Sequence, residues 1–578
     1  MKTLLQIIVL LFFYNSFSQT NFYVDKVSGN DTNNGSAATP WKTIQKAANA
    51  AVPNSIVNIK AGTYNENVIV NVSGTAGNYI VFKNYLNDVV LIDGSGTTGS
   101  TLLTVTNKRY LKFENFTIQN KTVNDAQGLL VETTGSNTST DLTFTNIKIK
   151  NINWTSSAST VPTETKNAQG FIAYGRNGGI TNLTLDNCEV SNNILGFSEA
   201  LAINGNIDGF TVKNCIVHDN TNIGIDILGH EGTASPAALD EARNGVVANN
   251  ICYNNVSNYA TSAGIYVDGA KNIIIERNKC YQNGWGIEIG AELNGTVQLI
   301  TVKNNLIYNN QQAGLSIGGY DTGTTGQVIN CIVRNNTFLK NNSLNDGTGE
   351  LTMTKASNCT FENNIFYTNT QNVLMSVENI TPQSNNTFNY NCWYSPNNNS
   401  NAVTVNWRGT SYSSFASYKT GTSQDNNSTY SNPNLTSLNL TSPDFKLLAG
   451  SGCIDTGKPA TLITTGELDY YSFNRITNTT IDKGAHEFSS FSLGINNNLK
   501  LNSIIYPNPS KGRLNIVYGD ADNDTFITVY NSLGQIIIKK NTPDLFNEVN
   551  LSGIINGIYF IEVNRNNQKK VIKVVLEK

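Results

Sequence analysis

One short phrase returns several times between residues 187 and 369. The phrase begins with asparagine, continues with a short β-branched run that contains a Cys or Tyr, and ends with asparagine again. A Gly then begins a second apolar run. Clear copies are N-C-I-V-H-D-N at Asn214–Asn220 and N-N-I-C-Y-N-N at Asn249–Asn255. The steps are 35, 28 and 27 residues when counted between the asparagines that end the phrase, Asn220, Asn255, Asn283 and Asn310. A period of about 20 to 50 residues is typical of stacked-repeat folds.

Each repeat fits strands better than helices. Its apolar runs alternate with a period of two, are only a few residues long, and are separated by Asn and Gly. One coil of such strands cannot bury its apolar face, so successive coils must stack on a continuous core. Asparagine tolerates the left-handed backbone of a tight bend, and asparagines stacked at one bend would form a ladder of amides. We therefore predict an all-β fold, a right-handed parallel β-helix.

Composition and the first residues limit the partners and the location. The net charge is -3 and only 14% of residues are charged, whereas nucleic-acid binding needs clustered basic surface. Residues 1–18 combine Lys2, an apolar stretch and small residues before Gln19, which predicts a signal peptide. The apolar stretch is too short to span a bilayer. We expect an exported monomer with no transmembrane segment and no nucleic-acid partner.

Several residues at repeated positions are predicted to serve packing. Six of the eight cysteines recur within the repeats, where a free thiol behaves as a small apolar group: Cys188, Cys215, Cys252, Cys280, Cys331 and Cys359. Cys392 and Cys453 lie outside this ladder, and a disulfide between them stays open. His218 aligns with tyrosines of later repeats and is expected to stack on them, and His486 is also expected to be structural.

The segment from residue 21 to residue 67 carries a family resemblance. It reads N-F-Y-V-D-K-V-S-G-N-D, then A-T-P-W-K-T-I-Q-K-A-A, then V-N-I-K-A-G-T-Y-N-E-N. These stretches resemble the N-terminal opening of the pectate-lyase-like superfamily of secreted right-handed β-helices. A helix is predicted over residues 41–51, because the apolar residues have helical spacing, Thr39 can serve as a cap and Pro40 suits the first helical position. Such a helix would cover the open end of the solenoid.

Two further resemblances divide the chain. S-P-D-F-K-L-L from Ser442 and D-K-G-A-H-E-F at residues 482–488 resemble the closing coil of the same superfamily, so a catalytic β-helix is expected over residues 19–488. A linker is expected over residues 489–502. Residues 503–578 contain Y-P-N-P-S-K-G, N-S-L-G-Q and N-G-I-Y-F-I-E-V and resemble the type A C-terminal sorting domain of the type IX secretion system. That resemblance implies a small β-sandwich, the type IX secretion machinery as a partner, and release to or attachment at the cell surface.

Outward positions of the repeats gather acidic side chains. In G-I-x-I the residue x points outward, which gives the column Asp226, Tyr266, Glu288 and Ser316. Later outward positions on these coils add Asp268, His230, Glu292 and Tyr320. Coils lie ~4.8 Å apart, and two like charges at about 5 Å repel by about 3 kcal/mol at an effective dielectric of 20. Such crowding indicates a functional site, with a cation between the groups or a proton on one of them.

The superfamily resemblance implies an enzyme acting on polysaccharides, commonly a lyase that acts on uronic acids. β-Elimination needs a charge that neutralises the substrate carboxylate, a base for the C5 proton and an acid for the leaving group at C4. For the first role we predict either Ca²⁺ or Arg243. The predicted calcium ligands are Asp226, Asp268 and Glu288. The predicted proton carriers are His230 and Tyr320, and the carboxyls of Asp268, Glu288 and Glu292 lie beside them as further catalytic candidates. The predicted sugar contacts are Tyr266 and Trp285.

The patch lacks the Lys or Arg base that calcium-dependent pectate lyases of this fold use, although Lys271 follows Asp268 closely. Alginate, ulvan or another acidic poly- or oligosaccharide is therefore as good a candidate as pectate, and chain cleavage and water elimination at a non-reducing end both stay open. Two alternatives remain. Asp268 and Glu288, about 7–8 Å apart as diagonal neighbours, would suit an inverting glycoside hydrolase. A non-catalytic polysaccharide-binding surface protein is the other.

Overall fold

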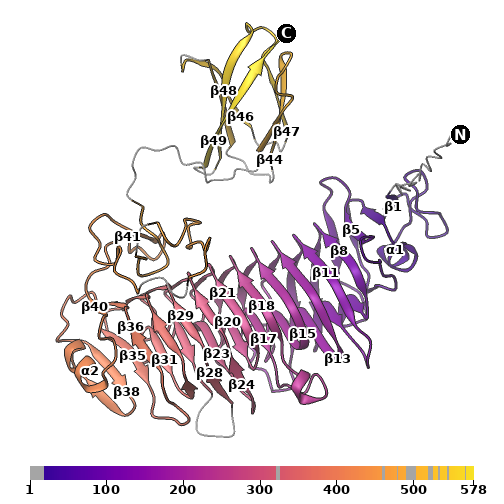
Figure 1. Ribbon diagram of the computed structural model, residues 1–578. Coiled ribbons are helices and arrows are strands. Elements are labelled where there is room, and N and C mark those ends of the chain that lie inside the picture. Colours follow the sequence, from indigo (N-terminus) through magenta and orange to yellow (C-terminus); the bar gives the residue numbers. More distant parts are fainter. Residues whose placement is uncertain are drawn as a thin grey trace, which may run out of the picture. The chain divides into compact units, whose positions relative to one another are not determined.

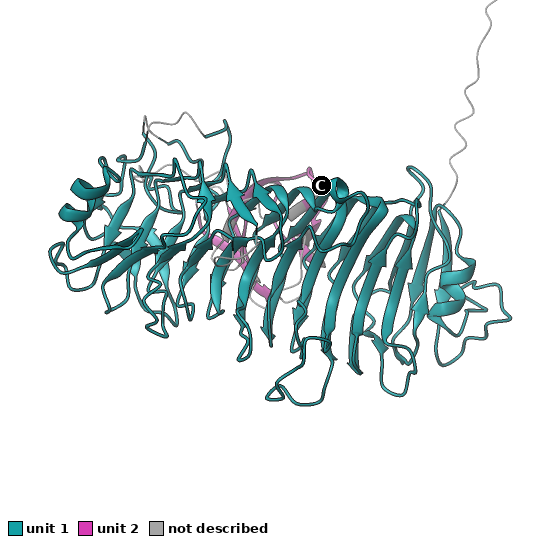
Figure 2. Cartoon of the chain, turned by 90° about the horizontal axis from the view of Figure 1, so that it is seen from below, with its two compact units in different colours: residues 1–489 teal, residues 490–578 magenta. Residues whose placement is uncertain are grey.

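Successive coils of parallel strands build most of the chain. The computed structural model describes residues 19–319, 326–458, 463–477, 480–489, 503–518, 525–531, 534–542, 546–565 and 568–577. The predicted signal peptide and almost all of the predicted linker lie outside these residues. The chain divides into two compact units, residues 1–489 and 490–578 (Figure 2). Among the described residues, no helix is long and apolar enough to cross a membrane.

The first unit has three sheet faces (Figure 1). One 27-stranded sheet forms two of them, because its long strands bend around a corner. The first face holds β7 (Thr101–Thr106), β10 (Ala126–Glu132), β13 (Ala168–Asp186), β15 (Leu201–Lys213), β17 (Ile225–Leu228), β20 (Ala263–Asp268), β23 (Trp285–Gly290), β27 (Leu315–Ile317), β31 (Leu351–Met353) and β35 (Val373–Val377). The second face continues β13 and β15 and adds β18 (Arg243–Ala248), β21 (Lys271–Glu276), β24 (Thr296–Gln298) and β28 (Gln327–Ile329).

A 13-stranded parallel sheet forms the third face. Its strands include β14 (Glu189–Ser191), β16 (Ile216–Asn220), β19 (Ile251–Asn255), β22 (Lys279–Tyr281), β26 (Leu306–Tyr308), β30 (Thr337–Leu339), β34 (Ile365–Tyr367) and β37 (Cys392–Tyr394). Neighbouring coils pair in parallel register, as in Val217, Cys252 and Cys280. The predicted parallel β-helix is therefore confirmed, and its core is filled by the inward residues of all three faces.

Two ladders of buried asparagine amides hold the corners on either side of the third face. In the first, each side-chain amide donates to the next, from Asn193 through Asn220, Asn255, Asn283 and Asn310 to Asn341. The second ladder runs through Asn250, Asn278, Asn305, Asn336, Asn364 and Asn391. A carboxyl accepts the last amide of each ladder, Glu350 in the first and Asp425 in the second. The predicted amide ladder is confirmed, and the structure adds a second one.

The helix at the N-terminal end starts later than predicted. It is α1 (Ile44–Ala50), and its cap is Thr43, whose side chain accepts a hydrogen bond from the Lys46 N–H at 3.0 Å. The predicted start at residue 41 with Thr39 as cap was wrong, because Trp41 forms a parallel bridge with Val24 instead. The helix buries Ile44, Ala47 and Ala48 at the end of the core, as the predicted cap should (Figure 1).

The expected closing coil is not a coil of the helix. The strands β41 (Leu435–Ser437) and β42 (Asp444–Leu447) form an antiparallel hairpin, and the described part of residues 435–488 packs on the outside of the third face. We call residues 435–488 the covering segment. The outward residues Leu306, Leu339 and Ile365 of that face are apolar, so they need a cover. At the far end of the solenoid, α2 (Phe415–Thr422) buries Phe415 and Tyr418 in the core (Figure 1).

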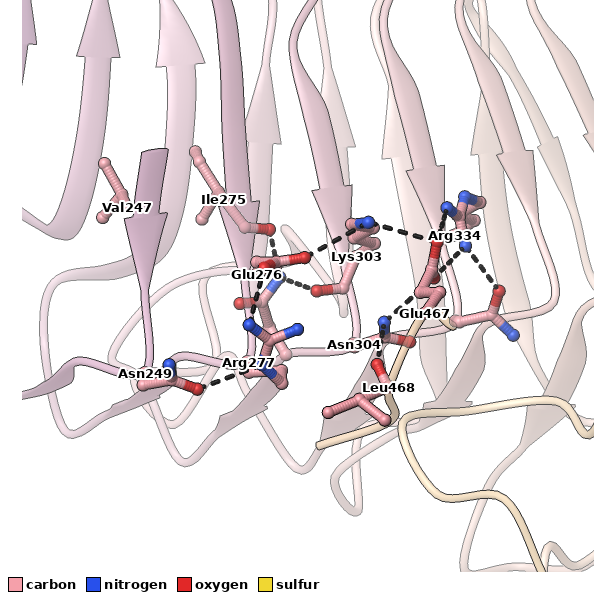
Figure 3. Close-up of polar contacts among 12 residues, drawn as sticks. Val247, Asn249, Ile275, Glu276, Arg277, Lys303, Asn304, Arg334, Glu467 and Leu468 are labelled. Atoms are coloured by element: carbon pink, nitrogen blue, oxygen red, sulfur yellow. Dashed lines mark hydrogen bonds and ion pairs between the residues drawn. The ribbon is translucent and has the colours of Figure 1, made fainter. Parts of the chain in front are cut away.

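A buried ionic network fastens the covering segment to the solenoid (Figure 3). Both oxygens of Glu467 accept hydrogen bonds from the Arg334 guanidinium at 2.7 Å, and Lys303 Nζ lies 3.1 Å from Glu467 Oε2. Burial acts to raise the pKa of Glu467, but the bonds and charges of Arg334 and Lys303 outweigh it and hold the pKa at about 2. Lys303 also contacts Glu276 at 3.2 Å.

The second unit consists of two antiparallel sheets. One holds β43 (Ser503–Tyr506), β44 (Arg513–Tyr518) and β47 (Phe546–Asn550), and the other holds β46 (Ile536–Thr542), β45 (Thr525–Asn531), β48 (Gly557–Arg565) and β49 (Gln568–Leu576). Residues from both sheets share one core, which includes Leu514, Ile516, Ile527, Val529 and Ile561. This is the arrangement of a small β-sandwich.

Candidate functional site

The first outward column forms in the predicted register. Asp226 on β17, Tyr266 on β20, Glu288 on β23 and Ser316 on β27 are successive partners on neighbouring coils. Asp268, two residues after Tyr266 on β20, is the register partner of Gly290. The carboxyls that the sequence places on different repeats therefore do lie on one face.

This face is covered, which the sequence did not indicate. Asp226 is 1% exposed, Tyr266 3%, Asp268 4% and Trp285 8%. The Trp285 ring packs with Tyr266 in a small apolar cluster instead of facing solvent. The loop after β23 folds back over the strands, and its Glu292 N–H donates to Asp268 Oδ1 at 2.9 Å. The prediction that Tyr266 and Trp285 offer surfaces to a saccharide is thus corrected.

Proximity and burial raise the pKa values of the acidic side chains. Burial, followed by the charge of Glu292, raises the pKa of Glu288 to about 8, and burial raises the pKa of Glu199 to about 8. The pKa values of Asp226 and Asp268 lie well above the usual range, first because of burial and then because of neighbouring carboxylates. Asp226 Oδ1 is buried and has no hydrogen-bond partner. At neutral pH Glu199 and Glu288 are therefore mostly protonated, and the shifts at Asp226 and Asp268 favour their protonated forms.

Glu199 belongs to this group, and sequence reasoning missed it. It lies two residues before Leu201, whose register partner Ile225 is next to Asp226. Extending the outward column to the coil of β15 gives Ala202, the partner of Asp226, so the period of two does not find Glu199, which precedes the strand. The acidic patch, as we now define it, consists of Glu199, Asp226, Asp268, Glu288, Glu231 and Glu292.

The predicted calcium ligands do not form a ready-made coordination site. In the part of the chain that the structure describes, no three His, Cys, Asp or Glu side chains are arranged to hold a metal ion. Burial and the neighbouring carboxylates raise the pKa values of Asp226 and Asp268, which disfavours the ionised form that binds Ca²⁺. Calcium at Asp226, Asp268 and Glu288 stays a prediction, and binding would require these side chains to ionise and move.

The sequence predicts that His230, Glu292 and Tyr320 align as a further outward column, and the structure does not form this column. His230 has a φ of 68° and Gly269 a φ of 80°, so the chain bends after β17 and β20. Ala270 therefore points into the core, where it is fully buried. His230 turns toward the loop after β23, since a Cβ added to Gly295 would lie 2.2 Å from its ring. Tyr320, the predicted partner of His230, lies outside the described residues.

An open pocket of about 600 Å³ is lined in part by His230. It is formed by the loops that follow β17 and β23 together with the first residues of the second-face strands. Its polar lining comes from His230, Glu241, Lys271, Asn294, Gln298 and Gln327. The Lys271 ammonium pairs with the Glu241 carboxylate, yet the Lys271 side chain stays 36% exposed, against 8% for Glu241. The buried His230 Nε2 has no hydrogen-bond partner among the described residues.

Arg243 is engaged by the protein itself. Its Nε lies 3.1 Å from Asp208 Oδ2, Nη2 donates to Asn206 Oδ1 at 2.9 Å, and Nη1 donates to the Glu241 carbonyl at 3.1 Å. The predicted role of Arg243 as the cation that meets a substrate carboxylate is thereby corrected. Lys271, its register partner on β21, is the cation that lines the pocket.

Two polar residues of the pocket, Lys271 and Gln298, are register partners on neighbouring coils. Arg243 begins β18, its partner Lys271 begins β21, and the partner of Lys271 is Gln298, the last residue of β24. Aligning the starts of these strands would have placed Lys271 beside Arg243, but it would have placed Thr296 and not Gln298 beside Lys271. Glu241 could not be found in this way, because it lies in a loop whose shape depends on Asp240. That carboxylate accepts hydrogen bonds from the N–H groups of Gly232 and Ala234.

Two family models match the chain. The model described as "Right handed beta helix region" matches residues 139–338, and the model described as "Secretion system C-terminal sorting domain" matches residues 504–577. The second match confirms that the C-terminal unit is a sorting domain, which indicates secretion and attachment at the cell surface. It also confirms the predicted secretion machinery as a partner.

One relative and two solved structures are similar to larger parts of the chain. The uncharacterized protein YwoF of Bacillus subtilis (strain 168) is 32% identical over 419 residues, which cover 70% of this chain and 86% of YwoF. Pectate lyase Pel9A is 17% identical, with 82% of this chain and 97% of Pel9A covered and a TM-score of 0.45. The A-module of the Azotobacter vinelandii mannuronan C-5 epimerase AlgE4 is 13% identical, with 67% and 93% covered and a TM-score of 0.34. The two structural likenesses are too weak to bear on activity, whereas the match to YwoF is long and close enough to define kinship. The chain is a right-handed β-helix with a C-terminal sorting domain, and it belongs to the family of YwoF.

Proposed function

We propose that the protein is a secreted enzyme that cleaves or dehydrates uronic-acid-containing saccharides by β-elimination, and that the pocket beside His230 is its active site. The observation that carries this proposal is the pocket lining. It combines the ammonium of Lys271, the imidazole of His230 and the amides of Asn294, Gln298 and Gln327. Amides suit the hydroxyls of a sugar, and an ammonium suits its carboxylate.

Lys271 supplies the charge that elimination requires at the uronate carboxylate. A positive charge there stabilises the enolate-like transition state that forms when the C5 proton leaves. Glu241 holds the ammonium in place without covering it, because Glu241 is buried and Lys271 is partly exposed. At about 4 Å and an effective dielectric of 20, one such charge pair contributes about 4 kcal/mol.

His230 and Glu231 carry the protons. The Nε2 atom of His230 is buried beside the pocket and has no hydrogen-bond partner among the described residues, so a turn of the ring toward the pocket would let it accept the C5 proton. Glu231, the next residue, is exposed, but partial burial of its carboxyl and the charge of Glu292 raise its pKa to about 7. A carboxyl with this pKa can donate a proton to the leaving oxygen at C4 near neutral pH.

The test is turnover on a panel of pectate, alginate and ulvan and their oligosaccharides, followed by the ultraviolet absorbance of the new C4–C5 double bond. Lys271→Gln and His230→Ala should each lower kcat/KM by at least about 100-fold. Lys42→Gln, the same change at an exposed site near the N-terminal end, should leave it unchanged. Full activity in both pocket variants would refute the assignment.

A glycoside hydrolase is the second candidate, and the acidic patch favours it. Glu288 holds a proton at neutral pH beside the exposed Glu292, and an inverting hydrolase needs one protonated and one ionised carboxyl. New reducing ends without new ultraviolet absorbance would identify hydrolysis. Binding without either product would identify the third possibility, a polysaccharide-binding surface protein.

A further inference from the structure

Two thiols face each other where the covering segment meets the third face of the solenoid. Cys392 lies on β37 and points outward, and Cys453 belongs to the covering segment. Both are fully buried in the cluster that joins the two parts. They are free thiols in this structure, each thiol shifts the pKa of the other, and Cys392 Sγ donates to the Ser431 carbonyl at 3.2 Å.

The surroundings of Cys392 favour its thiolate. The hydrogen bond from Cys453, aided by the charge of Lys483 and a hydrogen bond from Ser431, outweighs burial and holds the pKa of Cys392 at about 7. Lys483 is 1% exposed and its Nζ lies 3.4 Å from Thr429 Oγ1, next to the thiols. The thiolate is the nucleophile of disulfide exchange. Because Cys453 and Lys483 belong to the covering segment, this low pKa describes the docked state and follows from the closeness of the two sulfurs.

The cysteines of the repeats differ from this pair in geometry. Cys252 and Cys280 are register partners on the neighbouring parallel strands β19 and β22, and both point inward. Their side chains leave the sheet in the same direction from strands ~4.8 Å apart, whereas a disulfide prefers a Cβ–Cβ distance of about 3.8 Å. Cys392 and Cys453 approach from opposite sides of an interface, so this restriction does not apply to them.

We propose that Cys392 and Cys453 are joined by a disulfide in the exported protein, where it fastens the covering segment to the β-helix. The sorting domain takes the chain out of the cytoplasm, and disulfides persist in such compartments. Two S–H bonds break and one S–S bond forms, with the release of two protons and two electrons. The electrons reduce the disulfide of an extracytoplasmic thiol–disulfide oxidoreductase to two thiols, through a mixed disulfide with the chain.

Burial sets the order of events. Neither sulfur is accessible in the folded protein, so exchange with the oxidoreductase takes place before the covering segment docks. Once formed, the bond is shielded from reductants by the same packing. Opening of the covering segment should then be slower than in the reduced protein by on the order of 100-fold, because the linked chain cannot separate.

The test is a thiol map of the full-length protein recovered after export. The protein is denatured in an alkylating reagent without reductant, digested and analysed by mass spectrometry. Of the eight cysteines, we expect six to be alkylated and the peptides of Cys392 and Cys453 to be linked until a reductant separates them. Alkylation of all eight cysteines, or a link from Cys392 to another cysteine, would overturn the proposal.

Two variants provide the controls. Cys280→Ser removes a ladder thiol and should leave the link intact, with five alkylated cysteines among the seven that remain. Cys392→Ser should abolish the link and leave Cys453 alkylated. A link that disappears in Cys280→Ser as well, with both variants folded by circular dichroism, would show that the ladder cysteines take part and would refute the specific pairing.

Discussion

The substitution Glu467→Gln removes one charge from the network that holds the covering segment and keeps the shape of the side chain. The ordinary pKa of 4.5 falls to about 2 in the folded protein. At about 1.4 kcal/mol for each pKa unit, this difference corresponds to about 3 kcal/mol of stability at neutral pH. The side chain of Glu467 is 1% exposed, so solvent screens the interaction little. Loss of one partner of a buried pair typically costs about 3–5 kcal/mol, which agrees.

The pH dependence of this stabilisation has a defined sign. The folded pKa is lower than the unfolded pKa, so the contribution of Glu467 is complete above about 4.5 and is lost as the pH falls toward 2. The difference in stability between the wild type and Glu467→Gln should therefore be about 3 kcal/mol at pH 7 and should disappear near pH 2.

Hydrogen exchange is the assay that isolates the covering segment, since segments can open without global unfolding. A loss of 3 kcal/mol should speed the exchange of backbone amides in residues 435–488 by roughly 150-fold. Glu378→Gln, the same chemical change at an exposed residue, is the matched control and should change nothing. An effect of Glu467→Gln below threefold, or one that persists unchanged near pH 2, would refute the account of the network.

Three further predictions concern the ladder, the acidic patch and the metal. Asn283→Ala removes the side-chain hydrogen bonds that Asn283 makes with Asn255, Asn310 and the Cys252 carbonyl. At about 1 kcal/mol for each bond, the free energy of unfolding measured by urea titration should fall by about 3 kcal/mol. A change below 1 kcal/mol would contradict the role of the ladder. The pKa of Glu288 is raised to about 8, so its proton contributes stability that is complete below about 4.5 and is lost as the pH rises toward 8. Glu288→Gln should therefore unfold at a temperature that depends less on pH between 5 and 8, and an unchanged pH dependence would argue against a protonated Glu288. If Lys271 neutralises the substrate carboxylate, as proposed, a chelator should leave turnover unchanged, and loss of activity that Ca²⁺ restores would instead favour calcium bound by the acidic patch.

The sequence was sufficient for the fold because the repeat carries its own register. The asparagines at the corners and the Gly that opens each strand of the first face fix which residues are partners, so that Asp226, Tyr266 and Glu288 align as predicted. The alignment failed beyond Asp268 because Gly269 bends the backbone and turns Ala270 inward. A period of two assumes a straight strand, whereas the glycines that recur where these strands end, Gly229, Gly269, Gly290 and Gly318, are the signal that the alternation stops there.

Burial was the other part that the sequence could not supply. Whether Tyr266 and Trp285 are open or covered depends on loops outside the repeat, such as the one whose Glu292 N–H reaches Asp268. The partner of Arg243 was hidden for a similar reason, because Asp208 lies on the preceding coil, at a position that had not been aligned. The repeat pattern therefore predicted which residues align better than it predicted which residues have access to solvent.

The central claim is that the pocket lined by His230 and Lys271 performs β-elimination on a uronic-acid saccharide. Its most direct test is the time course of ultraviolet absorbance when the full-length protein acts on acidic polysaccharides and their oligosaccharides, compared with Lys271→Gln. We predict absorbance from the wild type on at least one uronate substrate and at least a 100-fold slower rise from the variant. Products that form without any absorbance, or equal rates from both proteins, would contradict the claim.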